Sequence, residues 1–87
     1  MENYTKAIEE YNFILSSQID IKTLINRAFC FAKINQYEKS IMDYTKILEI
    51  ESKNIHALYN RALSYEKSNK FKEVMLNLHR RFTTLVS

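Results

Sequence analysis

The 87-residue chain contains no glycine, no proline and no tryptophan, and it has a single cysteine. Average usage would place about ten glycines and prolines in a chain of this length. Their absence removes the usual turn residues, which argues against a fold rich in β-hairpins. It also excludes the phosphate-binding loop, the dinucleotide-binding fingerprint and the nucleophile elbow, because each of these motifs requires glycine.

The chain also lacks concentrated charge and long apolar runs. Its net charge is +3, and the basic residues are spread along the sequence rather than clustered as in nucleic-acid-binding proteins. Cys30 has no second cysteine with which to form an internal disulfide, which suits a reducing compartment. No apolar run reaches the roughly 18 residues of a membrane-spanning helix. We therefore expect a cytoplasmic, intracellular protein without a membrane segment.

Two stretches of the chain repeat each other at a fixed distance. Residues 21–28 read IKTLINRA and residues 55–62 read IHALYNRA, 34 positions later, with five of the eight positions identical. A second match has a shift of 33, and it aligns Tyr4, Ile8 and Tyr11 with residues 37, 41 and 44. A constant period of this length is typical of repeat architectures. We therefore divide a single domain, 1–87, into a half-unit at 1–19 and full units at 20–53 and 54–87.

Each half of a unit has the apolar spacing of an amphipathic helix. The pattern predicts five helices, at about 3–17, 21–34, 37–51, 55–68 and 71–85. Asn3, Asp20 and Asn54 precede three of these segments and are suitable N-caps. Asn35 and Asn69 stand between paired helices, where a left-handed residue commonly ends a helix. Breaks of two or three residues favour antiparallel helical hairpins.

This unit resembles the tetratricopeptide repeat (TPR), a helix-turn-helix unit of 34 residues. The packing positions of that family fall on Leu24, Arg27, Ala28, Phe31, Ser40, Tyr44 and Ile47, and then on Leu58, Arg61, Ala62, Tyr65, Val74, Leu78 and Arg81. Val74 and Arg81 depart from the pattern, since both positions are usually small. The resemblance implies an all-α, right-handed α-solenoid of about five helices. It also implies a non-catalytic scaffold that binds proteins and needs no cofactor.

In tetratricopeptide proteins the first helix of each unit lines a concave groove that holds a peptide or helix of a partner. The resemblance therefore implies a partner-binding groove formed by Lys22, Ile25, Asn26, Phe29, Lys33, His56, Tyr59, Asn60, Leu63 and Lys67. Amide side chains such as Asn26 and Asn60 can hydrogen-bond a peptide backbone without reading its sequence. Apolar and aromatic members suit hydrophobic anchors, and lysines suit an acidic segment.

Each of these assignments has a structural alternative. Asn26 and Asn60 are also able to contact a neighbouring helix or loop, and Phe29 and Leu63 fit a core between helical layers. Lysines are most often simply solvated. One tetratricopeptide subclass binds the acidic tail of chaperones through lysine and arginine clamps. Here only Asn26 and Asn60 match that clamp, and its basic positions are occupied by residues such as His56.

Catalysis and metal binding have little support in the sequence. Cys30 has no histidine and asparagine placed to activate it, and we expect it to be a buried small residue. His56 and His79 are 23 positions apart, which is not a metal-ligand spacing. We therefore expect no enzyme activity and no metal site.

Two further partner hypotheses remain open. The half-unit at 1–19 lacks its paired helix, so one hypothesis is a structural or assembly fragment of a longer tetratricopeptide protein. An exposed apolar end would also favour self-association into a homo-oligomer. The basic residues Lys70, Lys72, Arg80 and Arg81 offer an RNA-binding alternative, although we favour a protein or peptide partner over nucleic acid.

Overall fold

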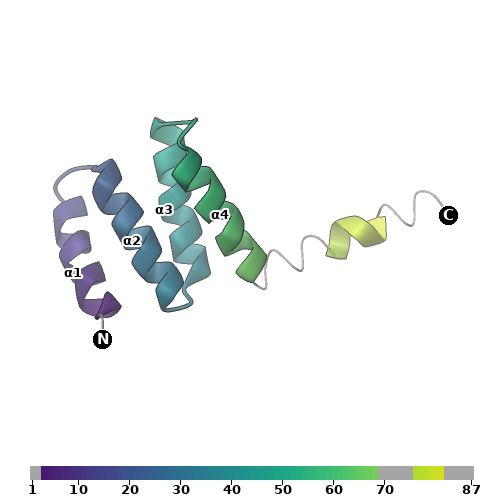
Figure 1. Cartoon of the computed structure of the whole chain (residues 1–87), viewed down its shortest axis with the longest axis horizontal. Helices are drawn as coiled ribbons and strands as arrows, with labels where there is room; N and C mark the ends of the chain where they lie inside the picture. The colour runs from purple at the N-terminus through teal and green to yellow at the C-terminus, as the bar shows by residue number, and fades with distance from the viewer. Residues whose placement is uncertain (1–2, 69–75, 82–87) are drawn as a thin grey trace.

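A computed structural model describes residues 3–68 and 76–81 of the chain. Four helices are present, with the bounds α1 Tyr4–Leu15, α2 Ile21–Lys33, α3 Tyr37–Ile50 and α4 Ile55–Lys67. Residues 76–81 form a further short helical segment, and no strand occurs among the described residues. Successive helices run antiparallel (Figure 1). The predicted all-α fold of helical hairpins is therefore confirmed.

Three of the helices begin at the side chains that the sequence predicts as N-caps. The side-chain oxygens of Asn3, Asp20 and Asn54 each accept a hydrogen bond from the backbone N–H three residues further on, at 3.0, 3.1 and 2.9 Å. Each bond satisfies a donor that the first helical turn leaves unpaired. At α3, the N-cap residue Gln36 makes no side-chain cap hydrogen bond. All three predicted caps are confirmed.

The turn between α2 and α3 depends on a left-handed asparagine. Asn35 has a φ angle of 64°, and among the described residues it is the one non-glycine residue with positive φ. The backbone N–H of Gln36 donates to the carbonyl of Phe31 at 2.9 Å, the six-to-one bond of a Schellman motif. The prediction for Asn35 is confirmed, while Asn69 lies outside the described residues.

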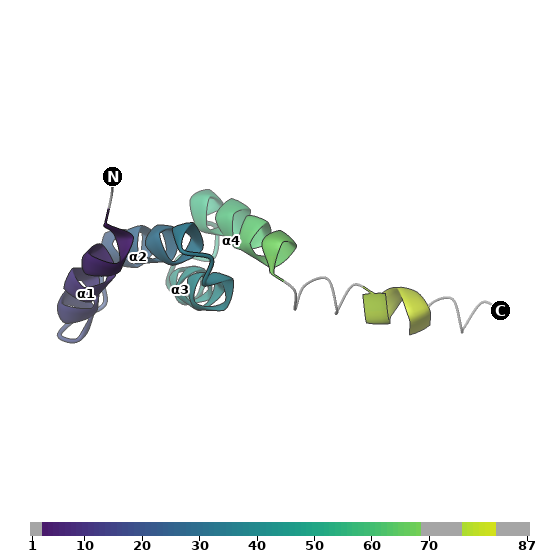
Figure 2. The same ribbon diagram turned by 90° about the horizontal axis from the view of Figure 1, so that it is seen from below.

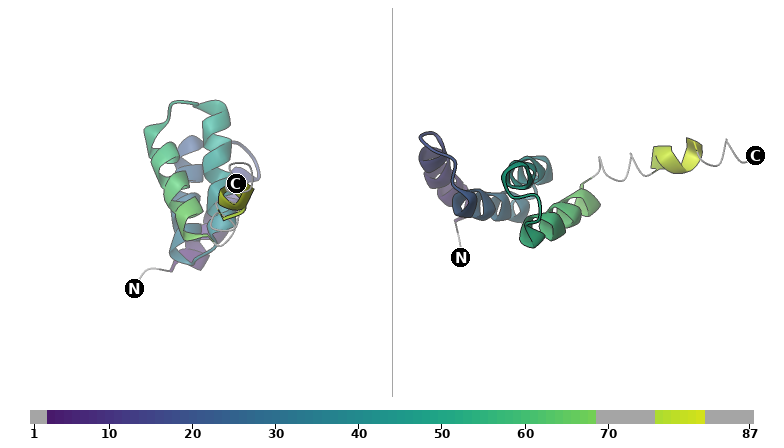
Figure 3. Two further views of the ribbon diagram at one scale, coloured as in Figure 1. Left: turned by 90° about the vertical axis from the view of Figure 1, so that its right-hand side faces the viewer. Right: turned by 90° about the horizontal axis from the view of Figure 1, so that it is seen from above.

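The four helices form two layers. α2 and α4 lie on one side of the molecule and α1 and α3 on the other (Figures 2 and 3). Each helix packs against the next along the chain, so α2 and α3 each have helices on two sides. One buried cluster joins α2, α3 and α4, and it consists of Leu24, Ala28, Tyr44, Ile47 and Ala57. A second joins α1 to α2 through Ile8, Cys30 and Phe31.

Small side chains let α3 approach its two neighbours. Ala28 of α2 and Ala57 of α4 are both fully buried, as expected for alanines where helices pack closely. Between α3 and α4, the hydroxyls of Ser40 and Ser64 lie 3.2 Å apart and form a buried hydrogen bond. The pair satisfies two buried polar groups at the point of contact.

The second full unit differs from the sequence-based expectation. Leu58, Ala62 and Tyr65, which the sequence assigns to packing positions, are exposed on α4. The physical reason is that α4 packs on α3 with a different face, through Ala57 and Ser64. Of the predicted helix at 71–85, the structure describes 76–81, which is helical with exposed side chains. Its remaining residues, including Val74, lie outside the described residues.

Candidate functional site

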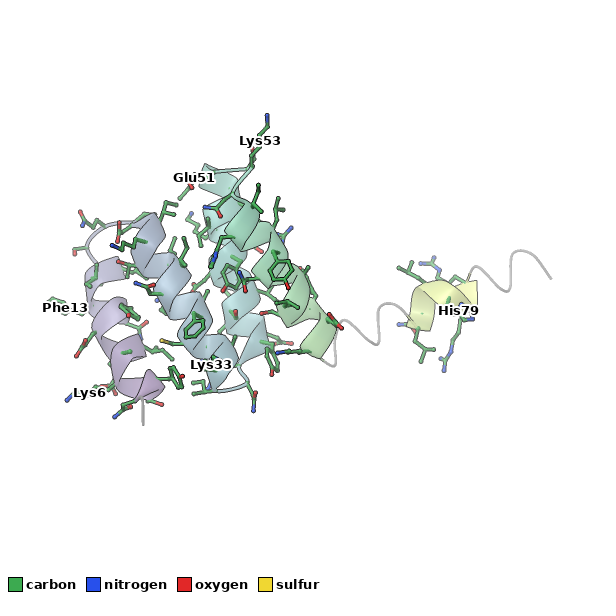
Figure 4. All side chains as sticks on the ribbon, in the orientation of Figure 1. Lys6, Phe13, Lys33, Glu51, Lys53 and His79 are labelled. Atoms are coloured by element: carbon green, nitrogen blue, oxygen red, sulfur yellow. The ribbon has the colours of Figure 1, made fainter. Side chains whose placement is uncertain are left out.

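The predicted groove residues belong to α2 and α4, whose shared side we call the α2/α4 face. Figure 4 views the molecule from this side. Seven of the ten predicted residues are exposed: Lys22, Asn26, Phe29, Lys33, His56, Tyr59 and Lys67. Ile25, Asn60 and Leu63 are partly buried.

A cleft of about 200 Å³ lies between α2 and α4. It brings together five of the predicted residues, namely Phe29, Lys33, Asn60, Leu63 and Lys67. One side is lined by the C-terminal half of α2 and the other by α4, and α3 contributes residues from below. We call this space the central cleft. It combines apolar side chains with two ammonium groups, a composition suited to an apolar anchor with acidic neighbours.

Sequence reasoning missed the residues that α3 contributes to the central cleft. Tyr37 and Tyr44 line it together with Ser64 of α4. The sequence pattern assigns none of these three residues a role in binding. The available signal was the spacing of seven residues between the two tyrosines, which places both on one face of α3. This spacing indicates a role in the cleft only once the positions of α2 and α4, which leave a space above α3, are known.

A second cleft, of about 320 Å³, lies between α1 and α2. It is lined by Asn3, Tyr4, Ala7, Tyr11, Asn26, Phe29 and Cys30. In the repeat alignment, with shifts of 33 for α1 and 34 for α2, these residues have counterparts in the central cleft. Tyr4, Tyr11 and Asn26 correspond to Tyr37, Tyr44 and Asn60. The two clefts are therefore copies of one repeating feature.

Phe29 lies at the border of the two clefts and lines both. Its ring is 48% exposed, so it is not a simple core residue. The ring meets Tyr4 edge-on with centroids 6.2 Å apart, and the Lys33 ammonium lies 5.2 Å from its centroid. Both contacts are of the kind that holds an aromatic side chain in a fixed orientation. An exposed aromatic held in this way is suited to binding an apolar ligand group.

The remaining predicted residues have more varied surroundings. The Asn60 amide donates to the His56 carbonyl at 2.8 Å, which leaves its oxygen as an acceptor on the cleft wall. Ile25 packs against the buried cluster of α2, α3 and α4. Neither of these two clefts is lined by Ile25, nor by the other three groove candidates Lys22, His56 and Tyr59.

Beneath α2, a partly buried ion pair connects it to α3, and a hydrogen bond from the same arginine connects it to α1. Arg27 donates from Nε and Nη2 to the two carboxylate oxygens of Asp43, at 2.9 and 2.7 Å, and from Nη1 to Asn12 Oδ1 at 2.8 Å. Hydrogen bonding to Asp43 raises the pKa of Arg27, although burial opposes that effect. This bidentate pair fixes the helices that carry the cleft walls.

The remaining candidates concern the lone cysteine, metal binding, membrane insertion and the basic C-terminal residues. Cys30 is buried, as the sequence predicts, between α1 and α2. Residues 3–68 and 76–81 include no group of three or more His, Cys, Asp or Glu side chains able to hold a metal ion. Within the same ranges, every helix is too short or too polar to cross a membrane. Arg80 and Arg81 are exposed, and Lys70 and Lys72 lie outside the described residues.

Several characterised proteins are similar to this chain. Sperm-associated antigen 1 of Rattus norvegicus is 37% identical over 75 residues, covering 83% of this chain and 8% of the relative. Mitochondrial import receptor subunit TOM34 of Homo sapiens is 37% identical over 54 residues, covering 61% and 18%. Protein unc-45 homolog B of Danio rerio is 35% identical over 79 residues, covering 82% and 8%. The chain thus spans a small part of each relative.

No family profile matches the chain, and no solved structure matches it. The assignment therefore depends on the repeat, the hairpins and the relatives together. The 34-residue period, the buried packing positions of the first full unit and the similarity to TPR-containing proteins all agree. The chain is a TPR-like repeat of helical hairpins, and it is similar over 83% and 82% of its length to two TPR-containing relatives.

Proposed function

We propose that this chain is a non-catalytic protein-interaction module that binds an extended peptide or a short helix of a partner on its α2/α4 face. The central cleft is the observation that carries the proposal. It joins two helices of successive repeats, and it presents Phe29 and Leu63 beside Lys33 and Lys67. A cytoplasmic location is part of the proposal, because the lone Cys30 is buried and suits a reducing compartment.

The chemistry of the cleft indicates what kind of segment fits. A volume of about 200 Å³ accommodates a side chain or two rather than a whole small-molecule ligand. Phe29 and Leu63 favour an apolar side chain, and the two lysines favour acidic residues on either side of it. The Asn60 oxygen is placed to accept a backbone N–H. One relative is named an import receptor subunit, a name that describes a binding protein.

Selection of displayed random peptides on the 87-residue protein tests the proposal. We expect the selected peptides to contain an apolar residue flanked by Asp or Glu. Phe29→Ala should weaken binding of a selected peptide about tenfold or more, because it removes a half-exposed aromatic anchor. Lys33→Ala combined with Lys67→Ala should weaken it further and reduce its dependence on salt.

Matched control variants lie outside the cleft. Met42 is 69% exposed on α3, in the other layer, so Met42→Ala removes an exposed apolar side chain as Phe29→Ala does. Lys46→Ala combined with Lys53→Ala removes two lysines outside the cleft. These controls should bind the selected peptide like the wild type. Equal losses in the control and cleft variants would contradict the proposal.

A further inference from the structure

The two ends of the described helical stack are complementary halves of one repeat. α1 is equivalent to α3, the second helix of a hairpin, and α4 is equivalent to α2, the first helix. The contact between α2 and α3 therefore shows how an α4 surface and an α1 surface would fit together. Each residue of that contact has a counterpart on an end helix.

The packing face of α4 is exposed where that of α2 is buried. Leu24 and Ala28 of α2 are 3% and 0% exposed beneath α3. Their counterparts on α4 are Leu58, which is 44% exposed, and Ala62, which is also exposed. Ile55, at the start of α4, is likewise exposed. Exposure of adjoining apolar residues on one helix face is typical of an interaction surface.

The equivalent face of α1 is open in part. Ile47 of α3 is fully buried, whereas its counterpart Ile14 is 38% exposed. Ala7, the counterpart of the fully buried Ser40, is partly exposed. Tyr11, the counterpart of Tyr44, is also partly exposed. Ala7 and Tyr11 already pack in part on Cys30 and Phe31 of α2, so Ile14 is the exposed apolar residue that α1 offers to a first-helix surface.

The charge of Arg61 indicates that the helix packed on α4 should carry a carboxylate. Arg61 repeats the surroundings of Arg27: it donates to Thr45 Oγ1 at 3.2 Å, where Arg27 donates to Asn12, and its guanidinium lies over Tyr65. Arg27 also has the carboxylate of Asp43, whereas no ion pair of Arg61 occurs among the described residues. The counterpart of Asp43 on α1 is Glu10, which is exposed.

The chain's own C-terminal residues are less complementary to the exposed face of α4 than the residues of α1 are. In the repeat register, the position of Asp43 is occupied by Asn77, and the position of the fully buried Ile47 by Arg81. Asn77 supplies no carboxylate for Arg61, and placing Arg81 at the position of Ile47 would bury a charge without a partner. On α1, Glu10 supplies the carboxylate and Ile14 places no charge at the buried position.

We propose that the chain associates head to tail with a second copy of itself, with α1 of one copy packed on α4 of the other. The new contact reproduces the contact between α2 and α3, with Leu58 and Ala62 against Tyr11 and Ile14 and with Arg61 bound to Glu10. Because the contact joins two different surfaces of the chain, it is heterologous and continues to larger assemblies as concentration rises. It uses the ends of the stack, so it is independent of the central cleft.

Light scattering coupled to size-exclusion chromatography of the 87-residue protein tests this inference. The mass should rise with concentration above the 10.4 kDa of one chain. A mass that stays at one chain up to the highest attainable concentration would overturn it, as expected if the chain's own C-terminal residues cover α4. Cleft variants such as Phe29→Ala should associate like the wild type, which separates this test from that of the proposed function.

Two end variants and a matched control locate the contact. Ala62→Lys should remain folded, because residue 62 is exposed in a single copy, and should stay monomeric. Glu10→Arg should weaken association about tenfold or more, because two cations would then meet. Glu9→Arg makes the same charge change at the neighbouring residue, whose counterpart Met42 is exposed, and should have no effect. Persistent association of Ala62→Lys would overturn the proposed geometry.

A mixture of the two end variants gives the sharpest outcome. The Glu10→Arg copy retains an intact α4 surface, and the Ala62→Lys copy retains an intact α1 surface. Mixed in equal amounts, they should form a complex of two chains that does not extend further. Absence of that complex, while wild-type copies still associate, would show that a different surface is used and would overturn the head-to-tail contact.

Discussion

At the scale of the residue, Arg27 connects three helices through one side chain. Its guanidinium binds Asp43 of α3 and Asn12 of α1, and its centre lies 5.7 Å from the Phe31 ring centroid. The tetratricopeptide pattern places Arg27 among the packing positions, but no sequence signal identified Asp43 or Asn12 as its partners. Those partners lie 16 and 15 positions away, and only the packed arrangement of helices brings them to the same point.

Replacing Arg27 should therefore destabilise the fold. Arg27→Ala leaves the carboxylate of Asp43, whose side chain is 7% exposed, without its cation. We expect a loss of about 2–4 kcal/mol in the free energy of unfolding, measured by urea denaturation. Lys46→Ala is the control, because Lys46 and Glu49 form an exposed pair at 3.6 Å that contributes about 0.5 kcal/mol or less. Similar losses in both variants would contradict this account of Arg27.

The buried phenol of Tyr44 should make the stability of the protein depend on pH in the alkaline range. Burial raises the pKa of its phenol above the usual 10.0, and the nearby charge of Asp43 acts in the same direction, whereas a hydrogen bond with Ser40 opposes it. Above pH 10 the unfolded chain loses this proton while the folded chain keeps it. Stability should therefore fall as pH rises from 10 through the folded-state pKa.

The variant Tyr44→Phe isolates this contribution. Thermal unfolding measured between pH 8 and about 11 should show a shallower loss of stability in the variant than in the wild type. Tyr59→Phe is the matched control, since Tyr59 is 63% exposed. An unchanged pH profile in Tyr44→Phe would show that its phenol does not contribute.

At the scale of the element, the helices and their ends were predictable because their signals are local. Asn3, Asp20 and Asn54 act on backbone groups three residues away, and apolar spacing identifies each helix without reference to its neighbours. The exposed face of α4 was not predictable in this way. Leu58 and Ala62 carry the same pattern as Leu24 and Ala28, and their burial depends on whether another helix covers them.

The turn at Asn35 gives a prediction for a single hairpin. Asn35→Ala should destabilise the protein by about 1 kcal/mol more than Asn35→Gly, because a Cβ disfavours the left-handed conformation and glycine does not. Both variants lose the hydrogen bond from the Tyr37 hydroxyl to Asn35 Oδ1, so their difference reports the backbone alone. Equal free energies of unfolding would show that φ at residue 35 is not limiting.

At the scale of the whole molecule, repetition creates both surfaces on which the two proposals depend. The two clefts are related by the same shifts that relate the helices, and the open ends are the two halves of one hairpin. Family resemblance predicted a binding groove on the α2/α4 face, and its binding role stays a prediction. It could not identify Tyr37 and Tyr44 as part of the cleft, because these lie on α3 and are exposed to the cleft only through the spacing of α2 and α4.

The binding role of the central cleft is the central claim, and NMR mapping of a bound peptide tests it most directly. A selected peptide would be titrated into isotope-labelled protein while backbone and side-chain resonances are followed. The account predicts the largest shifts at Phe29, Asn60 and Leu63, with Met42 and Lys46 in the other layer unchanged. Perturbations confined to α1 and to the Met42 and Lys46 side of α3, with the cleft residues unaffected by a saturating peptide, would contradict it.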